Sequence, residues 1–189
     1  MITRIFQCWL GLCTVMLAVA VPAQAAQWKV DYARSELIFI SRQLNVPVDG
    51  TFKRFQVALD FDPAHPETSR ARIEIDMPSI ATGAVDADEE AKTTDWLDVA
   101  TYPTASFVST SVNRVDADRY TASGTLTIKG TTRSATLPFS IKPLSGGALQ
   151  LAGEYTMKRL DFKIGGGVWG DTDVVADEVK LRYTLMLLP

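Results

Sequence analysis

The sequence contains few of the residues on which thiol, metal and histidine chemistry depend. Of 189 residues, two are cysteine and one is histidine. Cys8 and Cys13 lie close to the amino terminus, so thiol nucleophiles and thiolate-bound metals are excluded from the rest of the chain. His65 lacks the partners that a catalytic triad or a histidine-rich metal site requires, and we interpret it as a surface turn residue. The sequence therefore predicts no metal, no cofactor and no catalytic group of these kinds.

Basic residues are outnumbered, and long apolar runs are scarce. The chain has 19 Lys and Arg against 22 Asp and Glu, a formal net charge of −3. This balance argues against a nucleic-acid-binding protein, in which an excess of basic residues is expected. A hydrophobic content of 47% is too high for a disordered chain, and the length suits one domain. The one uninterrupted apolar run is at the start.

The amino-terminal segment Met1 to Ala26 has the pattern of a cleaved secretory signal. A positively charged start precedes an apolar core, Leu10 to Val21, and the small residues at Ala23 and Ala25 match a peptidase site. The apolar core is short for a membrane span of about 20 residues, which weakens the alternative of a retained anchor. We predict a signal peptide at 1–25 and one exported domain, without disulfides, at 26–189.

The rest of the chain alternates apolar and polar residues in many short stretches. In one of them Ala71, Ile73 and Ile75 alternate with charged side chains. Period-two alternation predicts antiparallel strands with one dry and one solvated face. About nine strands are expected, at 28–32, 36–42, 50–62, 70–77, 104–113, 121–128, 134–141, 149–158 and 178–187.

A sheet of so many strands with one apolar face must curl into a barrel or split into a sandwich. The strands are long and the Cys–Trp–Cys spacing of an immunoglobulin sandwich is absent, so we favour the barrel. Asp86 to Val99 does not alternate and begins with acidic residues, which predicts a short helix at about 86–98 across a barrel opening or side. The expected fold class is an all-β antiparallel barrel of eight or nine strands with one short helix.

Two acidic stretches do not fit the ion sites that they superficially suggest. The carboxylates between residues 86 and 90 spread around a helix and lack the spacing and glycine of a calcium loop. Those between 171 and 177 follow Gly165 to Gly167, but no Lys-Ser/Thr pair completes a phosphate cradle. We interpret the first as a solvated helix start and the second as a mobile loop near the barrel mouth.

Two groups of cations lie beside aromatic residues: Lys53 and Arg54 between two phenylalanines, and Lys158, Arg159 and Lys163 around another. One interpretation is that their aliphatic stems cover apolar surface while the charges stay in water. The other is a clamp for an anionic headgroup at the rim of a hydrophobic cavity. The headgroup candidates are then Arg54, Arg159 and Lys163.

Several segments, in order along nearly the whole exported domain, resemble the YceI-like family of exported lipid-binding proteins. Each is a turn with flanking strand residues, and together they form an ordered set. The matching stretches are 28–31, 37–39, 50–55, 59–63, 95–99, 102–107, 123–132, 158–164 and 177–181.

The resemblance implies a lipocalin-like barrel in the periplasm of a Gram-negative bacterium that binds a long isoprenoid lipid without enzymatic activity. It suggests transport or storage of a polyprenyl phosphate or isoprenoid quinone. A membrane cytochrome of the b561 type is an implied partner, since some relatives are joined to one, and a dimer is an open alternative to a monomer. The residues expected to line the cavity or its entrance are Phe39, Phe55, Phe107, Phe139, Tyr155 and Phe162, with Trp96 and Trp169 near the entrance.

Three alternatives stay open at this level. A packed barrel needs the same alternation as a hollow one, so a structural or stress-related interaction protein is possible. An outer-membrane barrel is disfavoured, because Arg72, Glu74 and Arg182 lie in its outward rows. A lipid-modifying enzyme would use a carboxylate such as Asp161 or Asp173 for proton transfer.

Overall fold

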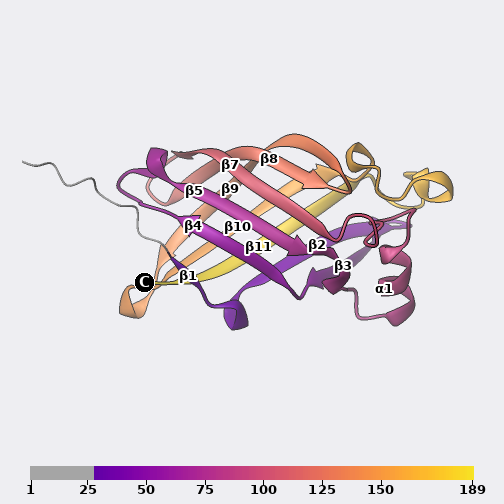
Figure 1. Cartoon of the computed structure of the whole chain (residues 1–189), viewed down its shortest axis with the longest axis horizontal. Coiled ribbons are helices and arrows are strands. Elements are labelled where there is room, and N and C mark those ends of the chain that lie inside the picture. Colours follow the sequence, from indigo (N-terminus) through magenta and orange to yellow (C-terminus); the bar gives the residue numbers. More distant parts are fainter. Residues whose placement is uncertain (1–27) are drawn as a thin grey trace, which may run out of the picture.

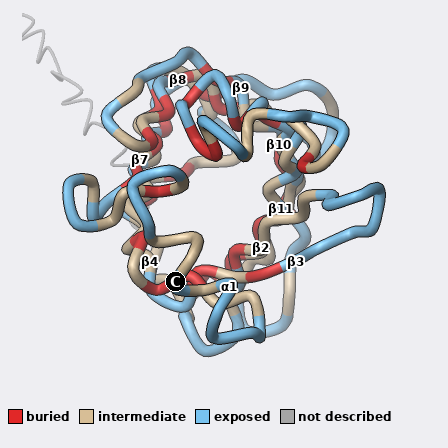
Figure 2. Tube along the Cα trace, turned by 90° about the vertical axis from the view of Figure 1, so that its right-hand side faces the viewer, coloured by how far each residue is buried: buried red, intermediate tan, exposed pale blue. Residues whose placement is uncertain are grey.

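Antiparallel strands make up most of the part of the chain that the structure, a computed structural model, describes: residues 28–189. The predicted signal peptide lies outside the described residues. The long strands run obliquely along the molecule (Figure 1), and the trace seen from one end forms a ring (Figure 2). This arrangement confirms the predicted all-β antiparallel barrel with one short helix.

Eleven strands form a single sheet within the described residues, nine of them at least six residues long. The sheet order is β4-β5-β7-β8-β9-β10-β11-β2-β3-β6, with β1 added to β11. The strand bounds are Lys29–Val30 (β1), Glu36–Gln43 (β2), Val46–Phe52 (β3), Phe55–Asp60 (β4), Arg70–Asp76 (β5), Ile80–Ala81 (β6), Thr104–Arg114 (β7), Arg119–Ile128 (β8), Thr131–Pro143 (β9), Leu149–Lys158 (β10) and Glu178–Leu188 (β11).

The helix α1 spans Val85–Lys92, and six short 3-10 segments occupy connections of the described chain. No helix between residues 28 and 189 is long and apolar enough to cross a membrane. The 3-10 segments are Tyr32–Arg34 (η1), Pro66–Thr68 (η2), Met77–Ser79 (η3), Ser145–Gly147 (η4), Leu160–Phe162 (η5) and Gly167–Gly170 (η6).

Several boundaries differ from the prediction: β3 begins at Val46, β9 spans Thr131–Pro143, and the two-residue β6 lies outside the predicted strands. Two further differences have a clear local cause. The stretch 50–62, expected as one strand, is two strands, because Lys53 and Arg54 turn a corner at which their backbone N–H groups donate to the carbonyl and hydroxyl of Ser79. The helix ends at Lys92, well before 98, since Thr93 is extended and its hydroxyl donates to the Glu90 carbonyl. Neither feature changes the strand alternation on which the fold prediction rested.

The apolar rows predicted from alternation face the interior of the barrel. On β8, Ala122, Leu126 and Ile128 are buried, while Thr125 between them is exposed. On β11, Leu187 is completely buried. Burying one such leucine contributes roughly 2 kcal/mol, and the same pattern repeats on the other long strands. Hydrophobic burial by alternate residues is therefore what curls the sheet.

One end of the interior is filled by three aromatic rings. Phe61 meets Tyr120 edge to face with centroids 5.2 Å apart and Phe139 at 5.8 Å, and Tyr120 stacks on Phe139 at 5.3 Å. Phe61 has no exposed surface. That end of the barrel is therefore filled by tightly packed aromatic side chains.

Candidate functional site

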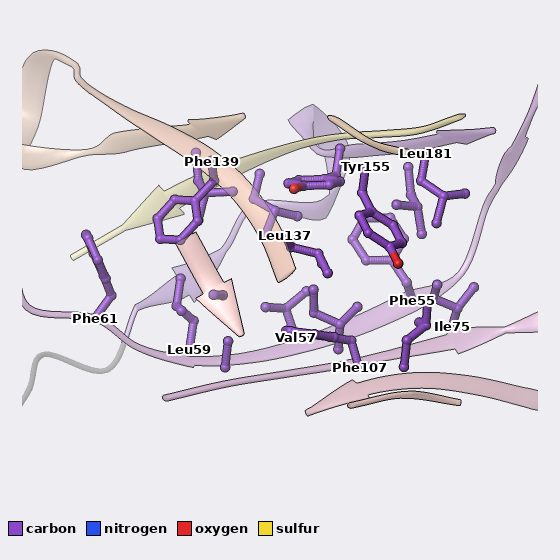
Figure 3. Close-up of a pocket in the computed structure, with 18 of the residues that line it drawn as sticks. Phe55, Val57, Leu59, Phe61, Ile75, Phe107, Leu137, Phe139, Tyr155 and Leu181 are labelled. Atoms are coloured by element: carbon purple, nitrogen blue, oxygen red, sulfur yellow. The ribbon is translucent and has the colours of Figure 1, made fainter. Parts of the chain in front are cut away.

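A narrow apolar cavity lies inside the barrel, as Figure 3 shows. About 990 Å³ between its walls is free of protein atoms, part of it open to solvent, and no polar atom is exposed on its lining. None of the lining residues is charged. They are Leu37, Phe55, Val57, Leu59, Phe61, Ala71, Ile73, Ile75, Phe107, Val112, Ala122, Leu126, Leu137, Phe139, Leu151, Tyr155, Leu181, Tyr183 and Leu185.

Strand register brings these side chains together. On β4 and β5, Phe55 pairs with Ile75, and Val57 pairs with Ile73. Directly opposite residues in an antiparallel pair point to the same face of the sheet, so both pairs enter the cavity. In Figure 3, Phe61 lies toward one end of the cavity, while Phe55 and Ile75 lie toward the other. The β4 edge strand thus lines the cavity along its length.

Four of the aromatic residues expected in the cavity are in its lining: Phe55, Phe107, Phe139 and Tyr155. They come from four different strands, β4, β7, β9 and β10, spread between residues 55 and 158. Whether they contact a ligand stays a prediction. Most of the remaining lining is aliphatic, and the alternation that predicted the strands had already placed many of these residues on the inward rows.

The other four expected residues are not part of the lining. Phe39 packs on Phe52, with ring centroids 5.7 Å apart, and covers Gly50, where a Cβ would lie 2.5 Å from its ring. Phe162 is buried within η5. Trp96 and Trp169 pack against each other, with centroids 5.5 Å apart.

The cavity keeps its two phenols protonated. The Tyr183 hydroxyl donates a hydrogen bond to the Pro138 carbonyl over 2.6 Å, and burial raises the pKa of Tyr183 well above its ordinary value. Burial, followed by the negative charge of Asp161, also raises the pKa of Tyr155. The lining is therefore uncharged over the whole physiological pH range.

Arg159 is a structural residue, which corrects its assignment as a headgroup candidate. Its side chain is almost completely buried, and its five N–H groups donate to five backbone carbonyls. A guanidinium has five donors in total, so none is left for a ligand. Its acceptors are the carbonyls of Ala176, Ile164, Gly165, Trp169 and Val175.

The other two headgroup candidates, Arg54 and Lys163, are exposed and are not in the cavity lining. The Arg54 Nε donates to the Asp76 carboxylate over 2.5 Å, which leaves its terminal nitrogens available. Lys163 has a φ of 59°, and its carbonyl accepts a hydrogen bond from the Lys129 Nζ over 2.8 Å. Of these two candidates, Arg54 is next to a cavity-lining residue in the sequence, Phe55, whereas Lys163 is not.

The acidic stretches and the histidine have local structural partners. Asp88 accepts hydrogen bonds from the backbone and hydroxyl of Thr82, which lower the pKa of its carboxyl group. The Asp177 carboxylate accepts from the Leu160 N–H. His65 is exposed. No group of three or more potential metal-ligating side chains occurs within the described part of the chain.

The carboxylates considered for lipid chemistry, Asp161 and Asp173, both lie at exposed positions in the connection between β10 and β11. Neither contributes to the cavity lining.

Comparison with known proteins agrees with this architecture. The YceI-like domain family matches residues 28–187. The UPF0312 protein of Pseudomonas savastanoi is 32% identical over 124 residues, which are 63% of this chain and 65% of that protein. Protein YceI of Escherichia coli is 32% identical over 120 residues, 61% of this chain and 62% of that protein. The match thus spans slightly less than two thirds of each relative.

Solved structures show the same fold. The crystal structure of Burkholderia cenocepacia BcnA has a TM-score of 0.81 and 36% identity, over 84% of this chain and 99% of that chain. A polyisoprenoid binding domain from Saccharophagus degradans, at 18% identity, has a TM-score of 0.67 over 87% of this chain and 98% of its own. The chain belongs to the YceI-like family, and the lipocalin-like barrel that the resemblance implied is confirmed.

Proposed function

We propose that this protein binds a long-chain isoprenoid lipid in its barrel and carries or stores it without chemical conversion. The hydrocarbon chain occupies the apolar cavity, and the polar end stays outside. The uncharged lining with no exposed polar atom is the observation that carries this proposal. A hydrocarbon chain is the kind of ligand that such a lining accepts without leaving a polar group unpaired. Family membership and the likeness to a polyisoprenoid binding domain support it.

The energetics permit such binding. A chain that buries on the order of 500 Å² of apolar surface gains roughly 12 kcal/mol. Association costs about 4–15 kcal/mol in lost freedom, and the cost is lower when the cavity exists before the ligand arrives. Each strand in the order from β4 to β6 is hydrogen-bonded to the next, and these bonds hold most of the cavity walls in place before a ligand binds.

The proposal also includes the cellular location of the protein and a membrane partner. Export through the amino-terminal signal would put the protein in the periplasm, and a cytochrome of the b561 type in the adjacent membrane is the proposed donor or acceptor of an isoprenoid quinone. Both rest on the sequence pattern and the resemblance. Immunoblotting of osmotic-shock fractions, with mass determination of the exported protein, tests the first: cleavage between residues 25 and 26 and release with the periplasm are expected.

Native mass spectrometry of the protein purified without detergent, followed by organic extraction, tests the binding itself. We expect a discrete added mass that extracts as a polyprenyl phosphate or an isoprenoid quinone, which also identifies the headgroup. A bare chain that also fails to take up added geranylgeraniol and decylubiquinone would overturn the proposal in favour of an interaction protein.

A further inference from the structure

The hydrogen-bonded sheet does not close on itself beside β4. That strand ends the sheet order, and hydrogen bonds from its backbone place its free edge beside the amino-terminal segment 28–35. We call this boundary the seam. Segment 28–35 is tied to β11 by the β1 ladder, by the Asp31 N–H donating to the Met186 carbonyl, and by the Ser35 hydroxyl accepting from the Met186 N–H.

Within the described chain, three hydrogen bonds join β4 and the residue after it to segment 28–35. The Trp28 N–H donates to the Leu59 carbonyl over 3.1 Å, and its indole Nε1 donates to the Phe61 carbonyl over 2.9 Å. The Val57 N–H donates to the Tyr32 hydroxyl over 3.1 Å. Two of the three depend on a side chain, whereas a sheet ladder uses backbone groups throughout. The seam is thus a line in the barrel wall that no regular backbone ladder closes.

A surface groove lies over one end of the seam and meets the cavity at a single residue. The groove is formed by η1, the start of β2, the end of β3 and the β3–β4 corner. Phe55 lines the groove as well as the cavity, so this residue lies between the two. The Tyr32 ring packs edge-on against Phe55, with centroids 5.5 Å apart. Tyr32 therefore contacts the Phe55 ring and also accepts a hydrogen bond from the adjacent β4 backbone.

The groove offers polar groups that the cavity lacks. Lys53 and Arg54 lie in it with Glu36. The Arg54 guanidinium uses its Nε on Asp76 and keeps four N–H donors, and Lys53 supplies an ammonium group. These donors can bind the hydrogen-bond acceptor oxygens of a lipid headgroup.

From these relations we infer that the seam is the entrance of the cavity and that the groove is the binding site for the polar end of the lipid. The chain passes between Phe55 and Tyr32, and the headgroup oxygens bind Lys53 and Arg54. The opposite end is packed by Phe61 with its aromatic neighbours, which leaves the headgroup at the Phe55 end. This inference rests on the proposed function, because it specifies the route into the same cavity.

Exchange kinetics of dansyl-labelled geranylgeraniol test the entrance. Tyr32→Phe keeps the aromatic contact and removes the hydrogen bond to Val57, so we expect association and dissociation each to accelerate about threefold while Kd stays within twofold. Phe55→Ala should accelerate both rates further and also weaken binding, since Phe55 lines the cavity. Tyr102→Phe, which removes a hydroxyl outside the groove and cavity, is the matched control and should leave both rates unchanged.

The outcomes separate the two proposals. If the unmodified protein binds no probe, the proposed function fails and the entrance with it. If it binds but Tyr32→Phe changes neither rate, while Trp169→Ala accelerates exchange, the lipid enters through the barrel end and the seam is overturned. Geranylgeranyl phosphate and geranylgeraniol, compared by calorimetry, test the groove: Lys53→Gln with Arg54→Gln should weaken the phosphate several-fold and leave the alcohol within twofold. Equal affinities for both would contradict the headgroup site.

Discussion

The guanidinium carbon of Arg159 lies 5.7 Å from the centroid of the Trp96 ring, so this charge is faced by an aromatic surface as well as by five backbone carbonyls. Burial lowers the pKa of the guanidinium, against the opposing charge of Asp177. Gly165 gives the cluster its close packing, because a Cβ there would lie 2.5 Å from an Arg159 nitrogen. The cluster ties the connection between β10 and β11 together.

Arg159→Lys should destabilise the protein strongly. An ammonium group has three donors where the guanidinium has five, so at least two buried carbonyls lose their partner. We expect the free energy of unfolding to fall by about 3 kcal/mol in urea denaturation. Arg54→Lys, the same exchange at an exposed position, should change it by less than about 0.5 kcal/mol. Equal losses in both variants would contradict the structural role of Arg159.

Filling the cavity should abolish lipid binding without unfolding the barrel. Leu137→Trp adds a bulky ring to the lining from β9, and we expect at least a tenfold loss of affinity for dansyl-labelled geranylgeraniol, measured by fluorescence titration. Thr136→Trp places the same ring on the outer face of that strand, where it should leave the affinity unchanged. If both variants bind equally well, the chain does not occupy this cavity.

High pH should destabilise the fold through its buried phenols. The pKa of Tyr183 is raised in the folded protein. Above pH 10 the unfolded chain releases this proton while the folded chain keeps it, so stability is complete below pH 10 and falls as pH rises. The slope is up to about 1.4 kcal/mol per pH unit for each such tyrosine. Urea titrations from pH 9 to 11.5 measure it. Tyr183→Phe should lower this slope by up to about 1.4 kcal/mol per pH unit, the contribution of one proton. An unchanged slope would exclude Tyr183 as its source.

Gly124 on β8 should not tolerate a side chain. A Cβ there would lie 2.1 Å from the Val108 carbonyl oxygen, at the irregularity between Ser109 and Ser111 in the β7–β8 ladder. Because backbone must move, Gly124→Ala should cost about 1–3 kcal/mol in the free energy of unfolding. Gly170→Ala, where nothing lies within 4 Å of the new atom, should cost far less. Thermal melts of the two variants compare them directly.

The sequence by itself determined most of the long strands and, where apolar and polar residues alternate, the face that each strand buries. Alternation such as Ala122, Leu126 and Ile128 against threonines is a local property, since successive residues of an extended chain point to opposite sides. It therefore identified inward residues such as Ile73, Leu137 and Leu181 before any contact was known. The helix was located by its lack of alternation, although its end at Lys92 depended on local hydrogen bonds of Thr93.

Only the tertiary structure decided which inward residues surround empty space and which fill it. Phe39 and Phe107 are both phenylalanines within long strands, yet the first packs on Phe52 and the second lines the cavity. Likewise, Arg54 and Arg159 are both cations beside aromatic residues, and one is exposed while the other is enclosed by carbonyls from residues up to 17 positions away. Cavity volume, burial of charge and the seam arise from contacts between segments distant in sequence, and no local pattern predicts them.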